Sequence, residues 1–295
     1  MDDRTMIQEA LFATGAIRVA EPDRPFWYTS GTIGPYYINT HFLYGGEQAA
    51  SLLLERIETL AAKDRLTFAQ QLGEDLMRQY AHDATYRQVI DAMVRIAKTI
   101  DVDLISGGER RDFFFSLPVA RLIDKPHLSI FKDGTRVWSG PEGEGARRVE
   151  PGKAGDLAGL RTLHIADIVT QAASFTRSWL PAVRGLGISM PAAMAVLDRK
   201  QDGRLHLEQE AVALHVLAEV DDALFAAAHE AGVLSGGQLE TVRSFNQDPL
   251  RFMREFFASH PDFIRSQLDA GGKARERALL CIQNGHAPSP ETTAS

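Results

Sequence analysis

Apolar and polar positions follow one another along the chain in a pattern that predicts strands and helices in turn. Between residues 102 and 220, short apolar runs of strand length are separated by segments with helical spacing, such as 113–123 and 174–187. Strands that alternate with helices predict the α/β class, with a parallel sheet flanked by helices on both faces. The predicted strands are residues 102–108, 127–131, 161–167, 190–199 and 211–220.

The segments around this core differ in their patterning. The N-terminal segment begins with a short predicted helix. The stretch that follows is rich in aromatic residues, Gly and Pro, which predicts short strands and tight turns. Helical spacing dominates before the core, as in residues 86–100, and after it, where Asp248 as N-cap and Pro249 at the first helical position predict the start of a helix. The last residues are polar and predicted to be disordered. We therefore expect five parts. The first (1–46) is an N-terminal helix followed by the aromatic strand-and-turn segment 26–46, which we call the hood. The others are a helical segment (47–100), the α/β core (101–220), a C-terminal helical extension (221–284) and a disordered tail (285–295).

One stretch inside the core, residues 133–159, is polar and Gly-rich and has no apolar periodicity. It predicts a long irregular loop. Loops of that length within a compact domain are usually functional or mobile.

Composition narrows the classes of function. The chain has 295 residues and a net charge of −7, which disfavours a nucleic-acid surface because phosphate backbones are bound by clustered cations. A single cysteine, Cys281, excludes an intrachain disulfide, and the histidines lack metal-ligand spacing. No apolar run approaches the length of a membrane span, and the start has no apolar signal region, so we expect a cytoplasmic protein that binds no membrane.

Candidate chemistry lies where predicted strands end, because ligands of parallel sheets bind at the carboxyl ends of the strands. In LHIADIVTQAASF, Asp167 follows a strand and residues 170–174 open a helix, whose free N–H groups favour an anion. In SGGERRD, Gly107 and Gly108 permit unusual backbone angles, and Arg110 and Arg111 are suited to clamp a pyrophosphate. The alternatives are a helix cap in the first case and a solvated turn in the second.

Two further segments carry candidate ligands for a planar ring. Ser30 and Gly31 offer a hydroxyl and an amide, and Tyr36 and Tyr37 offer faces for stacking. Arg199, directly after a strand, is suited to bind a carboxylate or ring oxygen. The alternatives here are ordinary aromatic packing in a hairpin and an ion pair at a strand end.

These segments, taken in order, resemble the type I phosphoribosyltransferases, most closely those that act on orotate. The resemblance covers about residues 8–220 and rests on FWYTSGTIGPYYIN, DLISGGERRDFFFSLPVA, LHIADIVTQAASF and AMAVLDRKQDG. It implies transfer of phosphoribose from phosphoribosyl pyrophosphate (PRPP) to the nitrogen of orotate or a related ring, with Mg²⁺ on the pyrophosphate. It also implies a homodimer.

The resemblance assigns roles to residues. Asp167 would contact the ribose hydroxyls, and Lys132 and Arg136 would stand in the mobile catalytic loop. Ser30, Gly31, Tyr36, Tyr37 and Arg199 would hold the ring. The PRPP contacts would be Asp167, Ile168, Thr170, Gln171, Ala172, Ala173, Ser174, Gly107, Gly108, Arg110 and Arg111.

Several positions depart from the family pattern. Ala166 replaces an acid, and Thr29 replaces a lysine. Ala172 replaces the glycine of the phosphate turn, and we expect its methyl group to narrow the room for a phosphate. Asp112 brings a negative charge that we expect to repel pyrophosphate. These departures keep two alternatives open. One is a catalytically inactive homologue that binds a nucleotide or phosphosugar and regulates. The other is a phosphoribosyltransferase with a different acceptor.

Overall fold

The computed structural model describes residues 3–153 and 155–287 of the chain. The chain divides into two compact units, each made of two stretches of sequence. The first unit is Met1–Ala16 with Asn39–Asp221, and the second is Ile17–Ile38 with Asp222–Ser295. The hood strands therefore form a unit with the C-terminal helices, a grouping that the sequence pattern did not indicate.

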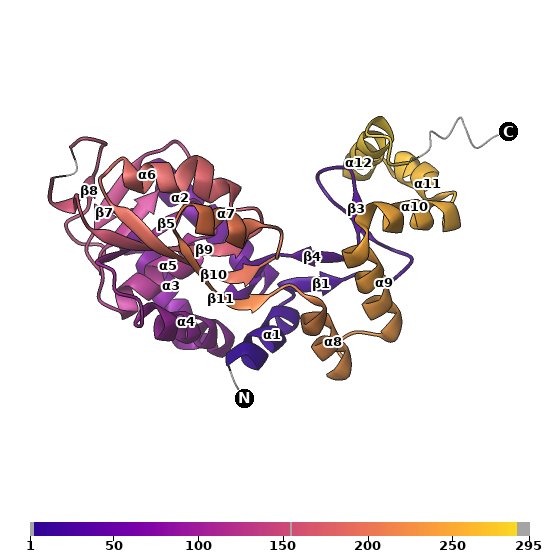
Figure 1. Cartoon of the computed structure of the whole chain (residues 1–295), viewed down its shortest axis with the longest axis horizontal. Helices are drawn as coiled ribbons and strands as arrows, with labels where there is room; N and C mark the ends of the chain where they lie inside the picture. The colour runs from indigo at the N-terminus through magenta and orange to yellow at the C-terminus, as the bar shows by residue number, and fades with distance from the viewer. Residues whose placement is uncertain (1–2, 154, 288–295) are drawn as a thin grey trace. The chain divides into compact units, whose positions relative to one another are not determined.

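A seven-stranded sheet in the order β11-β10-β9-β5-β6-β7-β8 forms the centre of the first unit (Figure 1). The first five strands in this order are parallel, and β7 and β8 are antiparallel additions at one edge. The predicted α/β class and parallel sheet are thus confirmed. The parallel strands are β5 (Leu104–Gly108), β6 (His127–Ile130), β9 (Arg161–Val169), β10 (Ser189–Asp198) and β11 (Ala213–Glu219).

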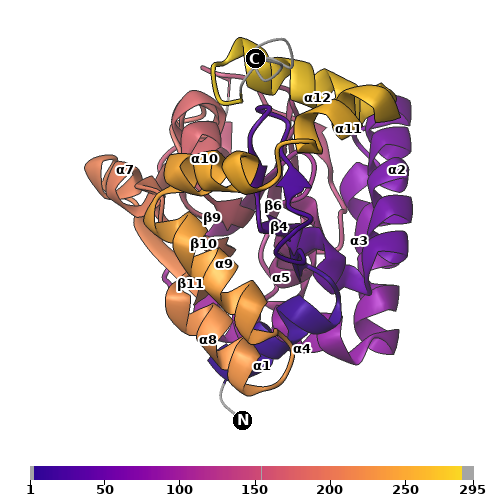
Figure 2. The same cartoon turned by 90° about the vertical axis from the view of Figure 1, so that its right-hand side faces the viewer.

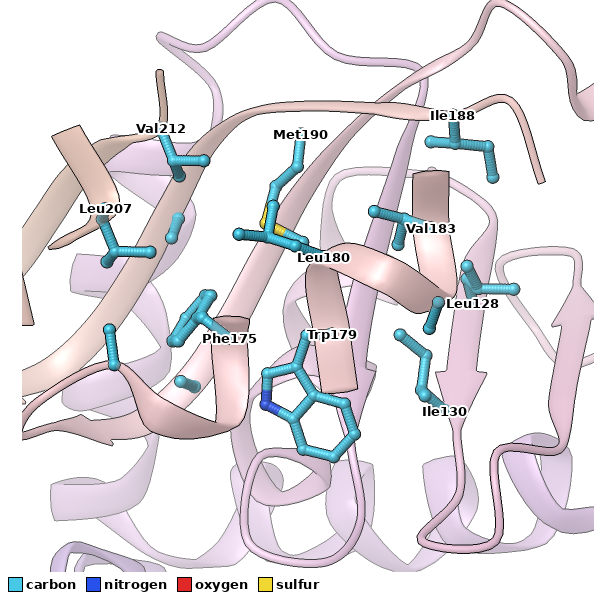
Figure 3. Packing of buried hydrophobic residues seen from close by; sticks show 14 of the residues in the cluster. Leu128, Ile130, Phe175, Trp179, Leu180, Val183, Ile188, Met190, Leu207 and Val212 are labelled. Carbon is cyan, nitrogen blue, oxygen red and sulfur yellow. The ribbon is translucent and has the colours of Figure 1, made fainter. Parts of the chain in front are cut away.

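One face of the sheet is covered by the chain that follows β9 and β10. The π-helical turn η3 (Phe175–Trp179) continues into α6 (Leu180–Arg184), and α7 (Gly203–Gln209) packs on β11. Their apolar side chains form one buried cluster with the strands, in which Trp179 and Phe175 lie over the sheet (Figure 3). Burial on both faces explains why these strands are almost continuously apolar.

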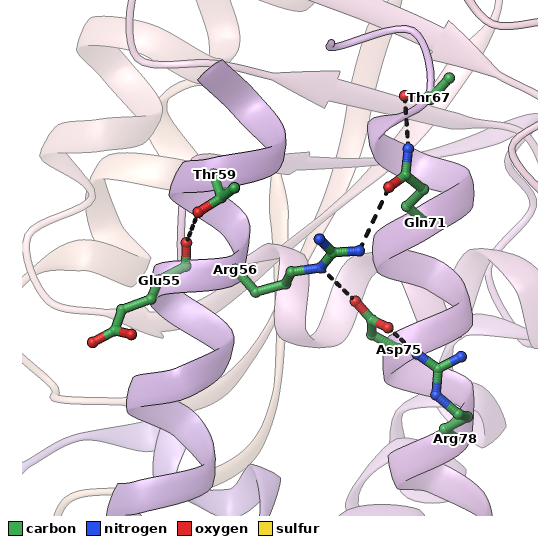
Figure 4. A network of polar contacts seen from close by, with 7 residues as sticks. All are labelled: Glu55, Arg56, Thr59, Thr67, Gln71, Asp75 and Arg78. Carbon is green, nitrogen blue, oxygen red and sulfur yellow. Dashed lines mark hydrogen bonds and ion pairs between the residues drawn. The ribbon is translucent and has the colours of Figure 1, made fainter. Parts of the chain in front are cut away.

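The other face is covered by α5 (Phe113–Leu122), whose three consecutive phenylalanines are all buried. Further helices pack onto α5 and onto one another, and Figure 2 shows α2 and α3 side by side. Figure 4 shows the polar contact between those two, in which Arg56 Nε donates to Asp75 Oδ2 at 3.0 Å. The helices of this layer are α1 (Asp3–Ala13), η1 (Thr40–Tyr44), α2 (Glu47–Lys63), α3 (Phe68–His82) and α4 (Ala84–Ala97).

The prediction of an irregular loop over residues 133–159 was wrong. This stretch contains β7 (Arg136–Ser139), β8 (Arg147–Arg148) and the short helix η2 (Gly155–Leu157). β7 does alternate, with Val137 and Ser139 buried, but four residues are too few for the period to stand out among glycines and charges. Pairing with β6 decides its structure.

In its described residues, the second unit consists of two small antiparallel sheets, β1–β4 and β2–β3, and five helices. Trp27 and Ile33 of the β2–β3 hairpin are buried against the helices, with Phe252, Met253 and Cys281. The helix start predicted at Asp248 and Pro249 is confirmed. The elements are β1 (Ile17–Val19), β2 (Phe26–Trp27), β3 (Ile33–Gly34), β4 (Tyr36–Ile38), α8 (Asp222–Glu230), α9 (Gly236–Gln247), α10 (Pro249–Ser259), α11 (Phe263–Ala270) and α12 (Gly272–Gln283).

Two other predictions concern the ends of the chain and the membrane. Most of the expected disordered tail, residues 288–295, lies outside the described residues. Within the described part of the chain, every helix is too short or too polar to cross a membrane.

Candidate functional site

A cleft of about 440 Å³ opens in the first unit at the carboxyl ends of β5, β6 and β9. Its walls come from the loop after β5, from Lys132 after β6, and from the turn that joins β9 to η3. The structure thus brings together two of the predicted strand-end segments, SGGERRD and LHIADIVTQAASF. The lining residues are Glu109, Arg110, Arg111, Asp112, Lys132, Ala166, Asp167, Ile168, Val169, Thr170, Gln171, Ala172, Ala173, Ser174, Phe175 and Trp179.

Gly107 and Gly108 lie within β5 and are needed for space. A Cβ at Gly107 would clash with the side chain of Ser116, and one at Gly108 would clash with the ring of Trp179. Neither glycine has a positive φ, so the expectation of unusual backbone angles was wrong. Close packing of α5 and η3 against the strand is the reason for glycine at both positions.

The loop after β5 presents its arginines differently. Both are half-buried and line the cleft, but Arg110 also forms an ion pair with Glu58 of α2. The peptide bond between Glu109 and Arg110 is cis. Glu109 Oε2 accepts a hydrogen bond from the amide of Lys132 at 3.0 Å, which joins this loop to the end of β6.

Asp112 is buried beneath the loop and is only 7% exposed. Its Oδ2 accepts from the amide of Gly108, and its Oδ1 accepts from the amide of Asp167, both at 3.1 Å. The sequence suggested a charge facing the cleft that repels pyrophosphate. Instead, both carboxylate oxygens are bound to backbone N–H groups of two different elements, which disperses much of that charge.

Asp167 is also 7% exposed, and its Oδ2 accepts from the hydroxyl of Thr40 at 2.9 Å. Burial, and after it the negative charge of Asp112, raises the pKa of Asp167 to about 7. The positive charge of Arg111 and the Thr40 hydrogen bond act in the opposite direction. A carboxyl with such a pKa changes its charge near neutral pH, as groups at functional sites often do.

The turn from β9 into η3 has the geometry of an anion site. The amide of Thr176 donates to the carbonyl of Ala172 at 3.1 Å, so the amides before Thr176 have no acceptor inside the helix. Ala172 adopts a left-handed conformation with φ 53°, which a glycine would adopt without strain. Ala172 is 4% exposed and belongs to the apolar cluster under the turn, as does Ala166.

Of the two expected catalytic-loop residues, the structure places one at the cleft. Lys132 is exposed and lines it. Arg136 lies on β7, and its Nε donates to the carbonyl of Ala182 in α6 at 3.0 Å. Arg136 is not among the residues that line the cleft.

The predicted ring ligands belong to different units. Arg199 is in the first unit, and its Nε is buried with no hydrogen-bond partner among the described residues. Ser30, Gly31, Tyr36 and Tyr37 are in the second unit.

Within the second unit, Tyr36 is a core residue whose hydroxyl donates to Asn246 Oδ1 at 3.1 Å. Tyr37 packs edge-on against Phe26 and Tyr28. Ser30 is exposed at the tip of the hairpin, and Gly31 is buried beneath α12.

The sequence reasoning missed several residues at the site, and two of them lie against its buried carboxyl groups. Thr40 contacts Asp167 from η1, far away in sequence, and nothing local marks it. His164 is fully buried beneath the cleft, and its Nε2 lies 3.6 Å from Asp112 Oδ2. A lone histidine within an apolar strand was a signal that could have identified it.

Comparisons with known proteins agree with this fold. No family model matches the sequence. The chain is similar in structure to Leishmania donovani UMP synthase, with a TM-score of 0.54 and 13% identity, over 81% of this chain and 41% of that one. The chain therefore spans less than half of that protein.

Two further similarities have a lower TM-score or cover a shorter stretch of sequence. The first is to the orotate phosphoribosyltransferase of Mycobacterium tuberculosis H37Rv in complex with inorganic phosphate. It has a TM-score of 0.45 and 13% identity, over 74% of this chain and 96% of that one. The second is to the adenine phosphoribosyltransferase of Malacoplasma penetrans (strain HF-2), 46% identical over 46 residues, which are 16% of this chain and 27% of that protein.

Proposed function

Because the chain has the fold of the type I phosphoribosyltransferases, we propose that it transfers phosphoribose from PRPP to a ring nitrogen and releases pyrophosphate. The observation that carries the proposal is the cleft. It combines helix-terminal amides that have no acceptor among the described residues with Arg111, Lys132 and the carboxyl of Asp167 at one edge of a parallel sheet. Cations and free amides of this kind favour a ligand with several phosphate groups.

In the proposed reaction, the acceptor nitrogen forms a bond to C1 of the ribose while the bond from C1 to pyrophosphate breaks. The pyrophosphate leaves with the electron pair, and the proton of the acceptor N–H passes to water. The amides of the β9–η3 turn would hold the 5′-phosphate, and Arg111 with Lys132 would balance the charge of the leaving group. Asp167, in its ionised form, would accept hydrogen bonds from the ribose hydroxyls.

Magnesium fits this site only together with the substrate. The described residues contain no group of three or more His, Cys, Asp or Glu side chains that could hold a metal ion. Phosphate oxygens would therefore supply most of its ligands, and the ion would neutralise charge on the pyrophosphate.

Orotate is our first candidate acceptor, since the hood segment resembles that of enzymes acting on orotate. The short match to an adenine phosphoribosyltransferase favours another ring as the second candidate. A third candidate, ligand binding without catalysis, is favoured by the bonding of Asp167 to Thr40 and by the absence of a carboxylate at Ala166. A homodimer, implied by the resemblance, is part of the same proposal.

The test is to incubate the protein with PRPP, Mg²⁺ and either orotate or adenine, and to measure pyrophosphate release. We expect turnover with one ring. Arg111→Ala should lower kcat/KM about 10- to 100-fold, since a charge-assisted hydrogen bond contributes about 1.5–3 kcal/mol. Arg95→Ala serves as the matched control, because Arg95 pairs with Asp3 and does not line the cleft.

Each outcome separates the candidates. Turnover with adenine alone would replace orotate as the acceptor. Calorimetric binding of PRPP without turnover on either ring would favour the binding protein. Failure of PRPP and of pyrophosphate to bind at all would overturn the phosphoribosyl-binding proposal.

A further inference from the structure

Strands β5 and β9 separate at the point where the cleft opens. They pair only from Leu104 to Ser106 on β5 and from Thr162 to His164 on β9. Beyond these residues, the two strands no longer supply each other with hydrogen-bond partners. The amides of Gly108 on β5 and Asp167 on β9 lie in this separated region and are buried, so each needs another acceptor.

Asp112 supplies both acceptors. One carboxylate oxygen takes the Gly108 amide and the other takes the Asp167 amide, each at 3.1 Å. This single side chain therefore joins the loop that carries Arg110 and Arg111 to the strand that carries Asp167. No neutral side chain of the same size offers two acceptor oxygens.

A group of buried polar side chains continues beneath Asp112. Thr162 donates its hydroxyl proton to Ser106 Oγ at 3.0 Å, so the Ser106 hydroxyl is free to donate to His164 Nδ1 at 2.9 Å. The other ring nitrogen of His164, Nε2, lies 3.6 Å from Asp112 Oδ2. This nitrogen has no hydrogen-bond partner among the described residues.

We propose that Asp112 is a positioning residue that holds the loop 108–112 and the end of β9 together in the form that binds a pyrophosphate-bearing ligand. The inference rests on the proposed function for the identity of that ligand. If Asp112 only repelled anions, removal of its negative charge would strengthen anion binding. As a positioning residue, Asp112 has the opposite effect, and removal of its charge weakens anion binding.

Two isosteric substitutions on the same loop test this. Asp112→Asn and Glu109→Gln each remove one negative charge from the cleft wall. Among the described residues, Glu109 accepts one backbone hydrogen bond, which a glutamine keeps. An asparagine at position 112 instead turns an N–H₂ group toward one of two backbone donors. The two variants therefore share the charge change and differ in the loss of an acceptor.

The first measurement is amide exchange of the ligand-free proteins. We expect the amide of Gly108 or Asp167 to exchange at least about tenfold faster in Asp112→Asn, because a buried donor has lost its partner. Both amides should be unchanged in Glu109→Gln. Unchanged exchange in Asp112→Asn would overturn the positioning role, whatever the protein's activity.

The second measurement is calorimetric binding of inorganic pyrophosphate with Mg²⁺. We expect roughly tenfold weaker binding to Asp112→Asn and up to about fivefold tighter binding to Glu109→Gln. Tighter binding to both variants would show that Asp112 acts through repulsion and would overturn the inference. No binding to the wild type would count against the proposed function, while the exchange measurement still decides the role of Asp112.

Asp112→Glu is the further variant in case asparagine impairs folding. It keeps both oxygens and the charge but displaces them by one methylene group. Weaker pyrophosphate binding is expected if geometry matters, and wild-type binding would contradict the inference.

Discussion

At the scale of single residues, Asp167 links the site to the stability of the protein. Its pKa in the folded protein is about 7, above the ordinary value of 3.8 that it regains on unfolding. The folded form therefore holds a proton between these values that the unfolded form has released. Asp167 costs no stability at pH below 3.8; the cost grows as the pH rises from 3.8 to about 7 and stays constant above that.

Asp167→Asn removes this cost while the side-chain oxygen still accepts from Thr40. We expect the variant to have a higher Tm than the wild type, with a difference that grows from about pH 4 to about pH 7 and then levels off. Thermal unfolding of both proteins across pH 4 to 8.5 measures this. An equal gain at pH 4 and pH 8 would contradict the pKa of Asp167.

Ala172 shows that a departure from a family motif need not close the site. The sequence suggested that a methyl group here narrows the phosphate turn. The structure places the residue in the apolar cluster, with the left-handed φ of 53° retained. The backbone of the turn thus keeps the conformation that glycine would give it, with strain of about 1 kcal/mol.

Ala172→Gly should therefore change little. Relief of strain and loss of a buried methyl group, each about 1 kcal/mol, offset each other, and phosphate affinity should change less than about threefold. The matched control is Ala173→Gly in the same turn, where φ is not positive and glycine should cost about 0.5–1 kcal/mol. Urea unfolding and phosphate titration compare the two. A large gain in phosphate affinity for Ala172→Gly would support steric closure instead.

At the scale of elements, the sequence predicted those strands and helices that have a long apolar period or a recognisable capping residue. The apolar strands β9 and β10 and the helix α4 were visible because each has a sustained period. β7 was missed because four alternating residues carry too little signal, and only pairing with β6 defines it. The contacts of Thr40 and Asp112 were invisible for a similar reason, since each joins segments far apart in sequence.

The start of α10 is an element that the sequence did predict, and it allows a quantitative test. Asp248 Oδ1 accepts from the amides of Leu250 and Arg251 at 3.0 and 2.9 Å. Asp248→Ala should destabilise the second unit by about 1 kcal/mol, the usual effect of losing such a cap. The control is Asp262→Ala, since Asp262 precedes α11 without a side-chain cap bond. Equal urea midpoints for the two variants would contradict the capping role.

At the scale of the whole molecule, buried histidines should set the response to acid. Burial lowers the pKa of His41 and of His127 to about 3, from an ordinary value of 6.5. On unfolding, both regain the ordinary value and take up protons that the folded protein excludes. Folded-state stability is therefore full above pH 6.5 and falls as the pH drops below it, by up to about 1.4 kcal/mol per pH unit for each histidine.

Asp167 has the opposite effect, because between pH 3.8 and 7 the folded protein holds a proton on Asp167 that the unfolded protein has released. Below pH 6.5, the net uptake on unfolding is therefore about one proton, and stability falls as it would with a single buried histidine. His41 offers a direct test. It is 3% exposed, its Nδ1 has no hydrogen-bond partner among the described residues, and its ring packs against Phe42 and Phe114. A phenylalanine at this position would keep the ring contacts and remove both the titration and the unpaired nitrogen.

We expect His41→Phe to match or exceed the stability of the wild type at pH 7.5 and to exceed it by a growing margin as the pH falls from 6.5 to 4.5. The margin should approach about 1.4 kcal/mol per pH unit, because one proton fewer is taken up on unfolding. His82→Phe is the control, since His82 is exposed. Urea unfolding at several pH values measures the slopes. A His41→Phe slope equal to that of the wild type would mean that His41 is protonated in the folded protein, and the acid response would then need another source.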